Sequence, residues 1–187
     1  MSQRGFGTQT LSGSPQPLLG TALTAAVNPT PDSSRGVLAP GFADSVATLP
    51  ITAGTVPLFR YGDHVAVGAS DSWNQGSTVA PDGGRVIAID SAANTIKVQG
   101  LLRAHASGEF VVLAIPCAQI NIDNGAAVLY LGEDGTVDAT SPTLIKEISA
   151  SASYSLGFPA MGNVLETQKV WVKGTGADTY LPNILTI

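Results

Sequence analysis

The stretch that decides the fold runs from Arg85 to Gln99 and reads RVIAIDSAANTIKVQ. Two apolar runs rich in β-branched residues, Val86–Ile89 and Ile96–Val98, flank the polar segment Ser91–Asn94. Val and Ile favour extended backbone, and a short polar segment between two such runs is typical of a β-hairpin. The sequence therefore predicts a pair of antiparallel strands at this point of the chain.

The same alternation of apolar runs and turn residues extends outward from the hairpin. Gly-containing turns are indicated at Asp82–Gly84 and Glu133–Gly135, because Gly adopts positive φ at no steric cost. No segment keeps helical periodicity over the ~11 residues of a mean helix, and one short helical turn is predicted around Ala160–Glu166. We predict an all-β body, either a compact barrel or a sandwich. The predicted strands are Val56–Tyr61, His64–Val67, Arg85–Asp90, Thr95–Gln99, Glu109–Ile115, Ala127–Leu131, Thr136–Ala139, Leu144–Ile148, Ser153–Phe158, Gln168–Lys173 and Thr179–Leu185.

The composition changes near residue 50. Residues 1–50 contain four charged side chains and half of the twelve prolines, which would repeatedly interrupt a helix or a central strand. Apolar side chains are spaced along this segment, so we predict a long extended N-terminal arm over residues 1–50 and a β-barrel or sandwich body over residues 51–187. On this hypothesis a deletion of residues 1–50 leaves a folded body that no longer attaches to its partner. The predicted interface anchors of the arm are Phe6, Leu11, Leu18, Leu19, Leu23, Val27, Val37, Leu38 and Phe42.

Charged residues are scarce along the whole chain. They make up 12% of the sequence against about 25% in an ordinary globular protein. The surface must therefore carry mainly Ser, Thr, Gly, Asn and Ala, which suits a protein whose surface is covered by neighbours. Nine Lys and Arg residues are scattered singly in a chain of net charge −5, so no nucleic-acid partner is predicted. A basic amphipathic face and an apolar run of ~20 residues are both missing, so no membrane partner is predicted either.

Residues capable of catalysis or metal binding are few. A zinc site needs three or four ligands, usually in closely spaced pairs, whereas His64, His105 and Cys117 stand apart in the sequence. Cys117 lies in an apolar run and is predicted to be a small buried hydrophobe. No Gly-x-Ser-x-Gly motif is present, and most carboxylates fall in predicted solvated turns, among them Asp71, Asp82, Glu133 and Asp134. We predict no catalytic, cofactor or metal site and no enzymatic activity. An enzyme or ligand-binding barrel, with a pocket that places His64 or His105 beside carboxylates, is the alternative.

Trp73 lies in the polar segment Ser70–Ser77. Tryptophan is enriched at the centres of protein interfaces, so Trp73 is a possible interface aromatic. It could equally be a loop side chain that folds back onto the body, and the sequence leaves both interpretations open.

Several short motifs in the body occur in a recognisable order. They are Gly62–Gly68 (GDHVAVG), Tyr130–Gly132 (YLG), Gly135–Val137 (GTV), Leu156–Phe158 (LGF) and Val170–Val172 (VWV). In this order the segment from about residue 55 to residue 175 resembles the small β-barrel capsid decoration (cement) proteins of tailed bacteriophages.

The resemblance implies a structural protein of the virion. Such a protein is made in the host cytoplasm, binds the major capsid protein on the outer surface of the capsid, often as a homotrimer, and braces it against internal pressure. The resemblance brings no cofactor and no catalytic residues. A tail or baseplate β module involved in attachment or host binding is the alternative function.

Overall fold

The computed structural model describes residues 2–31, 45–74, 77–157, 165–175 and 178–187. It confirms the predicted all-β class: the elements are antiparallel strands joined by turns and by three short 3-10 segments. The chain divides into two compact units. The first unit comprises residues 1–19, 73–77 and 115–187, and the second comprises residues 20–72 and 78–114.

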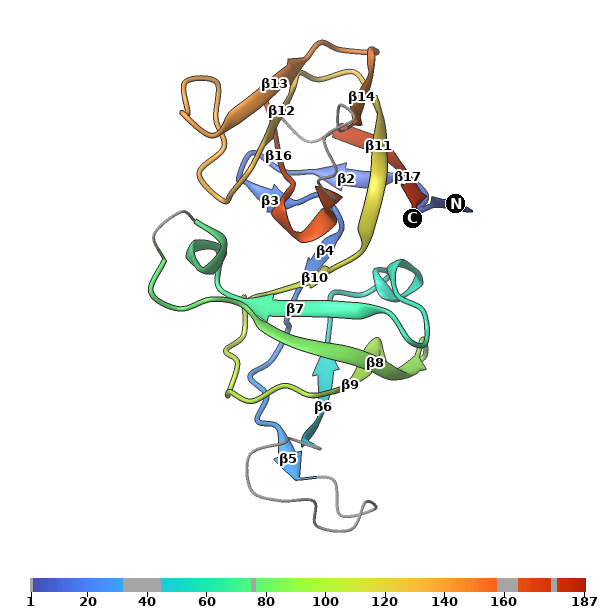
Figure 1. Ribbon diagram of the computed structural model, residues 1–187, viewed down its shortest axis with the longest axis vertical. Helices are drawn as coiled ribbons and strands as arrows, with labels where there is room; N and C mark the ends of the chain where they lie inside the picture. The colour runs from blue at the N-terminus through green and yellow to red at the C-terminus, as the bar shows by residue number, and fades with distance from the viewer. Residues whose placement is uncertain (1, 32–44, 75–76, 158–164, 176–177) are drawn as a thin grey trace. The chain divides into compact units, whose positions relative to one another are not determined.

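The second unit is built on one antiparallel sheet of order β4-β10-β7-β8-β9-β6-β5. A backbone bridge between Leu23 and Ile51 joins the segment after β4 to the segment after β6, and Thr24 N–H donates to the Pro50 carbonyl (3.0 Å). These contacts bring the β4 side of the sheet against the end of β6, as in a small, partly closed barrel. Strands β7 and β8 run side by side in Figure 1. The strands are β4 (Gly20–Ala22), β5 (Thr30–Pro31), β6 (Ser45–Pro50), β7 (His64–Gly68), β8 (Asp82–Asp90), β9 (Thr95–Gln99) and β10 (Phe110–Leu113).

The predicted hairpin is confirmed as β8 and β9. Val86 lies opposite Val98, and Ile89 lies opposite Ile96. The turn is shaped by Asp90, whose Oδ1 accepts hydrogen bonds from two backbone N–H groups of the turn, each at 3.0 Å. Asn94 completes the turn at φ 52°, a left-handed conformation that Asn tolerates better than most residues.

The first unit contains two antiparallel sheets arranged as a sandwich. The larger sheet has the order β1-β17-β11-β14, with β2 paired to β17 and β15 paired to β11; the smaller sheet has the order β13-β12-β16-β3. Their buried side chains form the core of this unit, including Ile120, Ile122, Leu129, Leu131, Trp171 and Ile184. The strands are β1 (Ser2–Gly5), β2 (Gln9–Leu11), β3 (Gln16–Pro17), β11 (Pro116–Asn124), β12 (Leu129–Gly132), β13 (Leu144–Ile148), β14 (Ser153–Gly157), β15 (Leu165–Glu166), β16 (Trp171–Gly174) and β17 (Asp178–Thr186).

The predicted N-terminal arm is not what the described residues form. Strands β1, β2 and β3 belong to the sheets of the first unit, and β4, β5 and β6 belong to the sheet of the second unit. The boundary at residue 50 is therefore wrong, since the structure divides the early chain after residue 19. The physical reason is that a proline-rich segment can supply edge strands and strand ends, and Pro17, Pro31 and Pro50 occupy such places.

Three local predictions also differ from the structure. Val56–Leu58 forms a 3-10 turn (η1) with a proline at its start, so the strand predicted over Val56–Tyr61 is wrong. Residues 136–139 form no strand, because Asp134 Oδ1 accepts hydrogen bonds from the Thr136 N–H and hydroxyl and holds this segment as a turn. The helical turn predicted around Ala160–Glu166 lies mostly outside the described residues, and Leu165–Glu166 is strand β15.

Candidate functional site

The predicted interface anchors that the structure describes are mainly core residues. Leu11, Leu18 and Leu19 are buried in the first unit, and Leu23 is buried in the second. Phe6 is 9% exposed, with the guanidinium carbon of Arg4 lying 4.7 Å from the centroid of its ring. Side chains enclosed by their own chain are not available to a partner, so their assignment as interface residues is wrong.

The remaining predicted anchors are either half-buried or outside the described residues. Val27 is half-buried, and its backbone exchanges hydrogen bonds of 2.8 and 2.9 Å with that of His105. Val37, Leu38 and Phe42 lie outside the described residues.

The structure places Trp73 as a side chain that folds back onto the body, the second of the two interpretations of this residue. Its ring meets that of the fully buried Trp171 edge to face, with centroids 5.6 Å apart and an interplanar angle of 61°. This geometry is favoured by the quadrupoles of aromatic rings. Trp73 therefore folds back onto the first unit.

The most strongly interacting ionisable side chains of the second unit surround His105. The Nδ1 atom of His105 lies 2.7 Å from Glu109 Oε2, and its Nε2 atom lies 3.3 Å from Asp82 Oδ2. Asp82 also accepts hydrogen bonds from the backbone N–H groups of Leu102 (2.7 Å) and Arg103 (2.9 Å). The His105 side chain is only 2% exposed. The hydrogen bonds to Asp82 connect the segment 101–109 to the start of β8.

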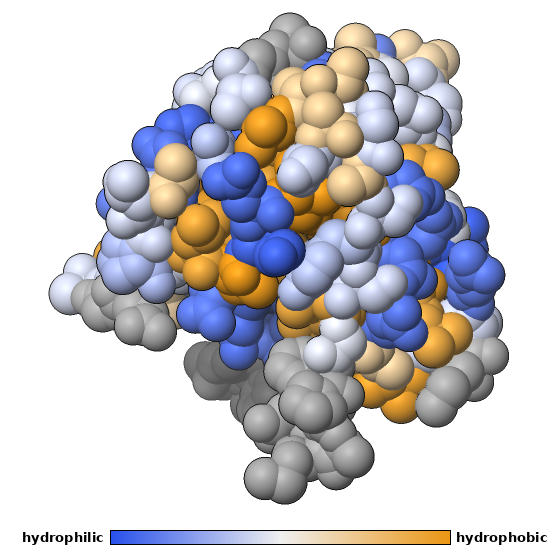
Figure 2. All heavy atoms as spheres, turned by 90° about the horizontal axis from the view of Figure 1, so that it is seen from above, coloured by the Kyte–Doolittle hydropathy of each residue, from blue (hydrophilic) through white to orange (hydrophobic). Residues whose placement is uncertain are grey.

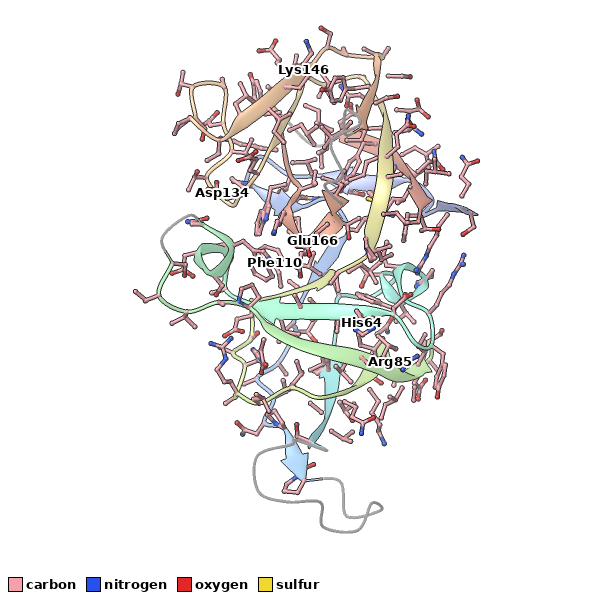
Figure 3. All side chains as sticks on the ribbon, viewed as in Figure 1. His64, Arg85, Phe110, Asp134, Lys146 and Glu166 are labelled. Atoms are coloured by element: carbon pink, nitrogen blue, oxygen red, sulfur yellow. The ribbon has the colours of Figure 1, made fainter. Side chains whose placement is uncertain are left out.

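The side chains of the His105 cluster, Asp82, His105 and Glu109, are engaged with one another. Both ring nitrogens of His105 lie within hydrogen-bonding distance of a carboxylate, Nδ1 of Glu109 and Nε2 of Asp82. Among the residues that the structure describes, no group of three His, Cys, Asp or Glu side chains is placed to hold a metal ion. His64 is exposed on β7, beside Arg85 of β8 (Figure 3).

The His105 cluster is not predicted from the sequence. Asp82 and Asp134 are predicted to lie in solvated turns, but both are buried, at 7% and 4% exposure, with hydrogen-bonded carboxylates. The available signal was the spacing of His105 and Glu109, which suits a local side-chain pair.

Cys117 is a buried thiol, as predicted from its apolar surroundings. It is fully enclosed in the first unit, and its Sγ lies 3.4 Å from the Leu165 carbonyl oxygen. Burial disfavours the thiolate and raises the pKa of Cys117 from 9.0 to about 11.

We expect Cys117 to be unreactive in the folded protein. Ellman's reagent at pH 8 should modify it only after denaturation. Between pH 9 and about 11 the unfolded chain loses this proton while the folded chain keeps it, so the free energy of unfolding should fall across that window. The Cys117→Ala variant should lose this part of the pH dependence, by at most about 2–3 kcal/mol. Rapid modification of the native thiol would contradict the buried placement.

A broad, nearly uncharged face is the candidate binding surface of the first unit. The outward side chains of β11, β14 and β17 alternate with the core residues Ile120, Ile122 and Ile184. These outward side chains are half-exposed or exposed. Asp123 is the one charged residue among the outward side chains of these three strands. We call this set the neutral face; its members are Gln119, Asn121, Asp123, Ser153, Ser155, Gly157, Thr179, Leu181, Asn183 and Leu185.

Hydrogen bonds order the polar groups of the neutral face. Asn121 Oδ1 accepts from the hydroxyl of Ser155 and from the amide of Gln119, each at 2.7 Å. The hydroxyl of Ser153 donates to Asp123 Oδ1 at 2.6 Å. These bonds fix side-chain rotamers in the free protein, which lowers the entropy that binding would cost.

Within the described residues, no helix is long and apolar enough to span a membrane. No family model, no curated protein and no solved structure matches this chain. The fold and its surface define an all-β protein in which a neutral sheet face is the best-developed candidate for binding.

Proposed function

We propose that this chain is a structural protein of a bacteriophage virion, without catalytic activity, that binds the outer surface of the capsid and stabilises it as a decoration protein. The observation that supports this proposal best is the neutral face. Charged side chains are depleted at the cores of protein interfaces, because a charge is costly to remove from water. A face with one carboxylate, already hydrogen-bonded to Ser153, can be covered at a small desolvation cost.

The distribution of apolar surface also supports a protein partner. Figure 2 shows apolar residues interspersed among polar ones on one face of the molecule. Leu181 and Leu185 bring half-exposed aliphatic groups to the neutral face on either side of Asn183. On this proposal the major capsid protein covers the neutral face, in place of the contacts first expected of an N-terminal arm.

The proposal is tested by binding to expanded capsids that lack decoration. The purified protein should co-sediment with them and raise their resistance to heat or to mechanical disruption. Absence of binding to such capsids would refute the proposal. Association with tails, baseplates or host cells instead would support the alternative of an attachment module.

The Asn183→Lys variant should bind capsids at least tenfold more weakly. It places an ammonium group on β17, between the half-exposed Leu181 and Leu185 of the neutral face, where covering it would cost desolvation energy. Ala88→Lys, on an exposed position of β8 in the second unit, is the matched control and should bind like the parent protein. Co-sedimentation over a range of concentrations measures both variants. Equal binding by the two variants would exclude the neutral face as the contact.

A further inference from the structure

No described strand pairs with the outer edge of β14, and this edge differs from the other sheet edges that the structure describes. Edge strands usually carry a charge or a proline, or are very short, because an exposed edge pairs readily with another strand. Each other edge strand among the described residues has such a feature: Arg4 in β1, three residues only in β2 and β4, Pro17 in β3, Pro31 in β5, Lys146 and Glu147 in β13, and Glu166 in β15. Figure 3 shows Lys146 on β13.

Strand β14 has none of these protecting features. Its five residues are Ser-Tyr-Ser-Leu-Gly, and no charged residue occurs between Glu147 and Glu166. Its pairing with β11 runs from Ser153 to Gly157 without a bulge. An uncharged, regular edge of this kind is a site for strand addition.

The phase of the β11–β14 ladder shows which backbone groups face the open edge. Asn124 N–H donates to the Ala152 carbonyl at 3.0 Å, so Ala152 directs its backbone toward β11. Because orientation alternates along a strand, Tyr154 and Leu156 do the same. Ser153, Ser155 and Gly157 therefore direct their N–H and C=O groups to the open edge.

Ser155 is the middle one of these three residues. If a second β14 approaches antiparallel about a twofold axis at Ser155, Ser155 of one copy lies opposite Ser155 of the other and Ser153 lies opposite Gly157. Every outward N–H then faces an outward C=O. On the core side of the sheet, the half-buried Tyr154 meets Leu156, and aromatic–aliphatic cross-strand pairs are favourable. The sequence of the strand thus complements itself.

Charge does not oppose such a pair. The carboxylate nearest to the edge on the neutral face is Asp123 on β11, one strand inside β14. Two copies of Asp123 would be separated by three inter-strand spacings across the strands, roughly 14 Å, and by four residues along them, roughly another 14 Å, so they would lie roughly 20 Å apart. That distance exceeds the Debye length of about 8 Å at physiological salt, so their repulsion is screened.

We propose that the open edge of β14 binds β14 of a second copy of this chain, forming a twofold antiparallel pair centred on Ser155. This contact goes beyond the proposed capsid function and does not depend on it. A five-residue edge buries much less than the ~800 Å² per partner of a standard interface. The association is therefore weak in solution and is strengthened where many copies are held side by side.

Sedimentation velocity over a wide concentration range tests the pair. The parent protein should show a dimer whose fraction rises with concentration. Ser155→Pro should abolish it while keeping the fold, because the N–H that proline removes faces the open edge and not β11. A parent protein that stays monomeric, or a trimer that persists unchanged in Ser155→Pro, would overturn the proposal.

A charge swap tests the twofold axis itself. The Ser155→Lys and Ser155→Glu variants should each be monomeric, since like charges would lie directly opposite each other, and a mixture of the two should form a heterodimer. Ser153→Lys is the matched control: its two copies would lie four residues apart along the strands, roughly 14 Å, and the dimer should persist. Failure of the mixture to associate, with both variants folded by circular dichroism, would refute pairing through Ser155.

Discussion

Removal of residues 1–50 should leave a chain that cannot fold. The deletion takes β1, β2 and β3 from the sandwich of the first unit and β4, β5 and β6 from the barrel of the second. It also takes five leucines that are at most 2% exposed: Leu11, Leu18, Leu19, Leu23 and Leu49. Each such loss costs about 2–5 kcal/mol even as a single Leu→Ala change, against a total stability of about 5–15 kcal/mol for a domain. Circular dichroism and thermal unfolding should show no cooperative transition.

A shorter deletion, of residues 1–19 alone, should unfold the first unit without removing any strand of the second. Without residues 1–19, the first unit loses the partners of β17 and β16 and the buried hydrogen bond from the Tyr180 hydroxyl to the Leu18 carbonyl (2.8 Å). Both tryptophans of the chain, Trp73 and Trp171, belong to this unit, so tryptophan fluorescence reports its folding. The emission of the deletion variant should match that of the denatured protein.

A point variant controls for the size of these deletions. Leu18→Ala should lower the free energy of unfolding by about 2–5 kcal/mol, whereas Thr24→Ala, at an exposed position of the same segment, should change it by less than about 0.5 kcal/mol. A 1–50 deletion variant that still unfolds cooperatively would instead favour the detached arm expected from the sequence.

The arm and the core segments are hard to distinguish in the sequence for a physical reason. Low charge, frequent proline and spaced leucines suit a segment that adds strands to the edge of a sheet. Residues 2–31 do add edge strands, but the sheets belong to the same chain. Local pattern does not specify whose sheet is extended, because that depends on contacts between residues as distant as Ser2 and Thr186.

Strands with strong local preference were predictable. The segments Thr95–Gln99 and Leu144–Ile148 form strands with the predicted bounds, because β-branched and other apolar residues dominate them. Strand β11 was missed, since Pro116–Asn124 is rich in Ala, Gln, Asn and Asp. It is nevertheless a central strand between β17 and β14, where tertiary hydrogen bonding outweighs its weak propensity.

The low charge of the candidate binding surface could be predicted from the sequence, but the residues that form it could not. The scarcity of charge indicated a surface covered by neighbours, and the structure describes a nearly uncharged face. Its residues come from three strands between positions 119 and 185, and their alternation relative to the core depends on registers that the sequence does not display.

Replacement of His105 by alanine should destabilise the second unit by about 3–5 kcal/mol. It removes the group that lies between the Asp82 and Glu109 carboxylates and leaves both without that partner in a largely enclosed place. The segment 101–109 should then loosen, because the ring that joins it to Asp82 is lost, while the backbone hydrogen bonds between residue 105 and Val27 remain. Urea unfolding followed by far-ultraviolet circular dichroism measures the change.

The other histidine gives the matched control. His64 is exposed on β7, so His64→Ala should alter the free energy of unfolding by less than about 0.5 kcal/mol. Asp82→Asn should also destabilise the protein, and the His105→Ala/Asp82→Asn double variant should cost less than the sum of the single changes, because both act on one network. A loss below about 1 kcal/mol in His105→Ala, or strict additivity in the double variant, would show that the His105 cluster does not hold the second unit together.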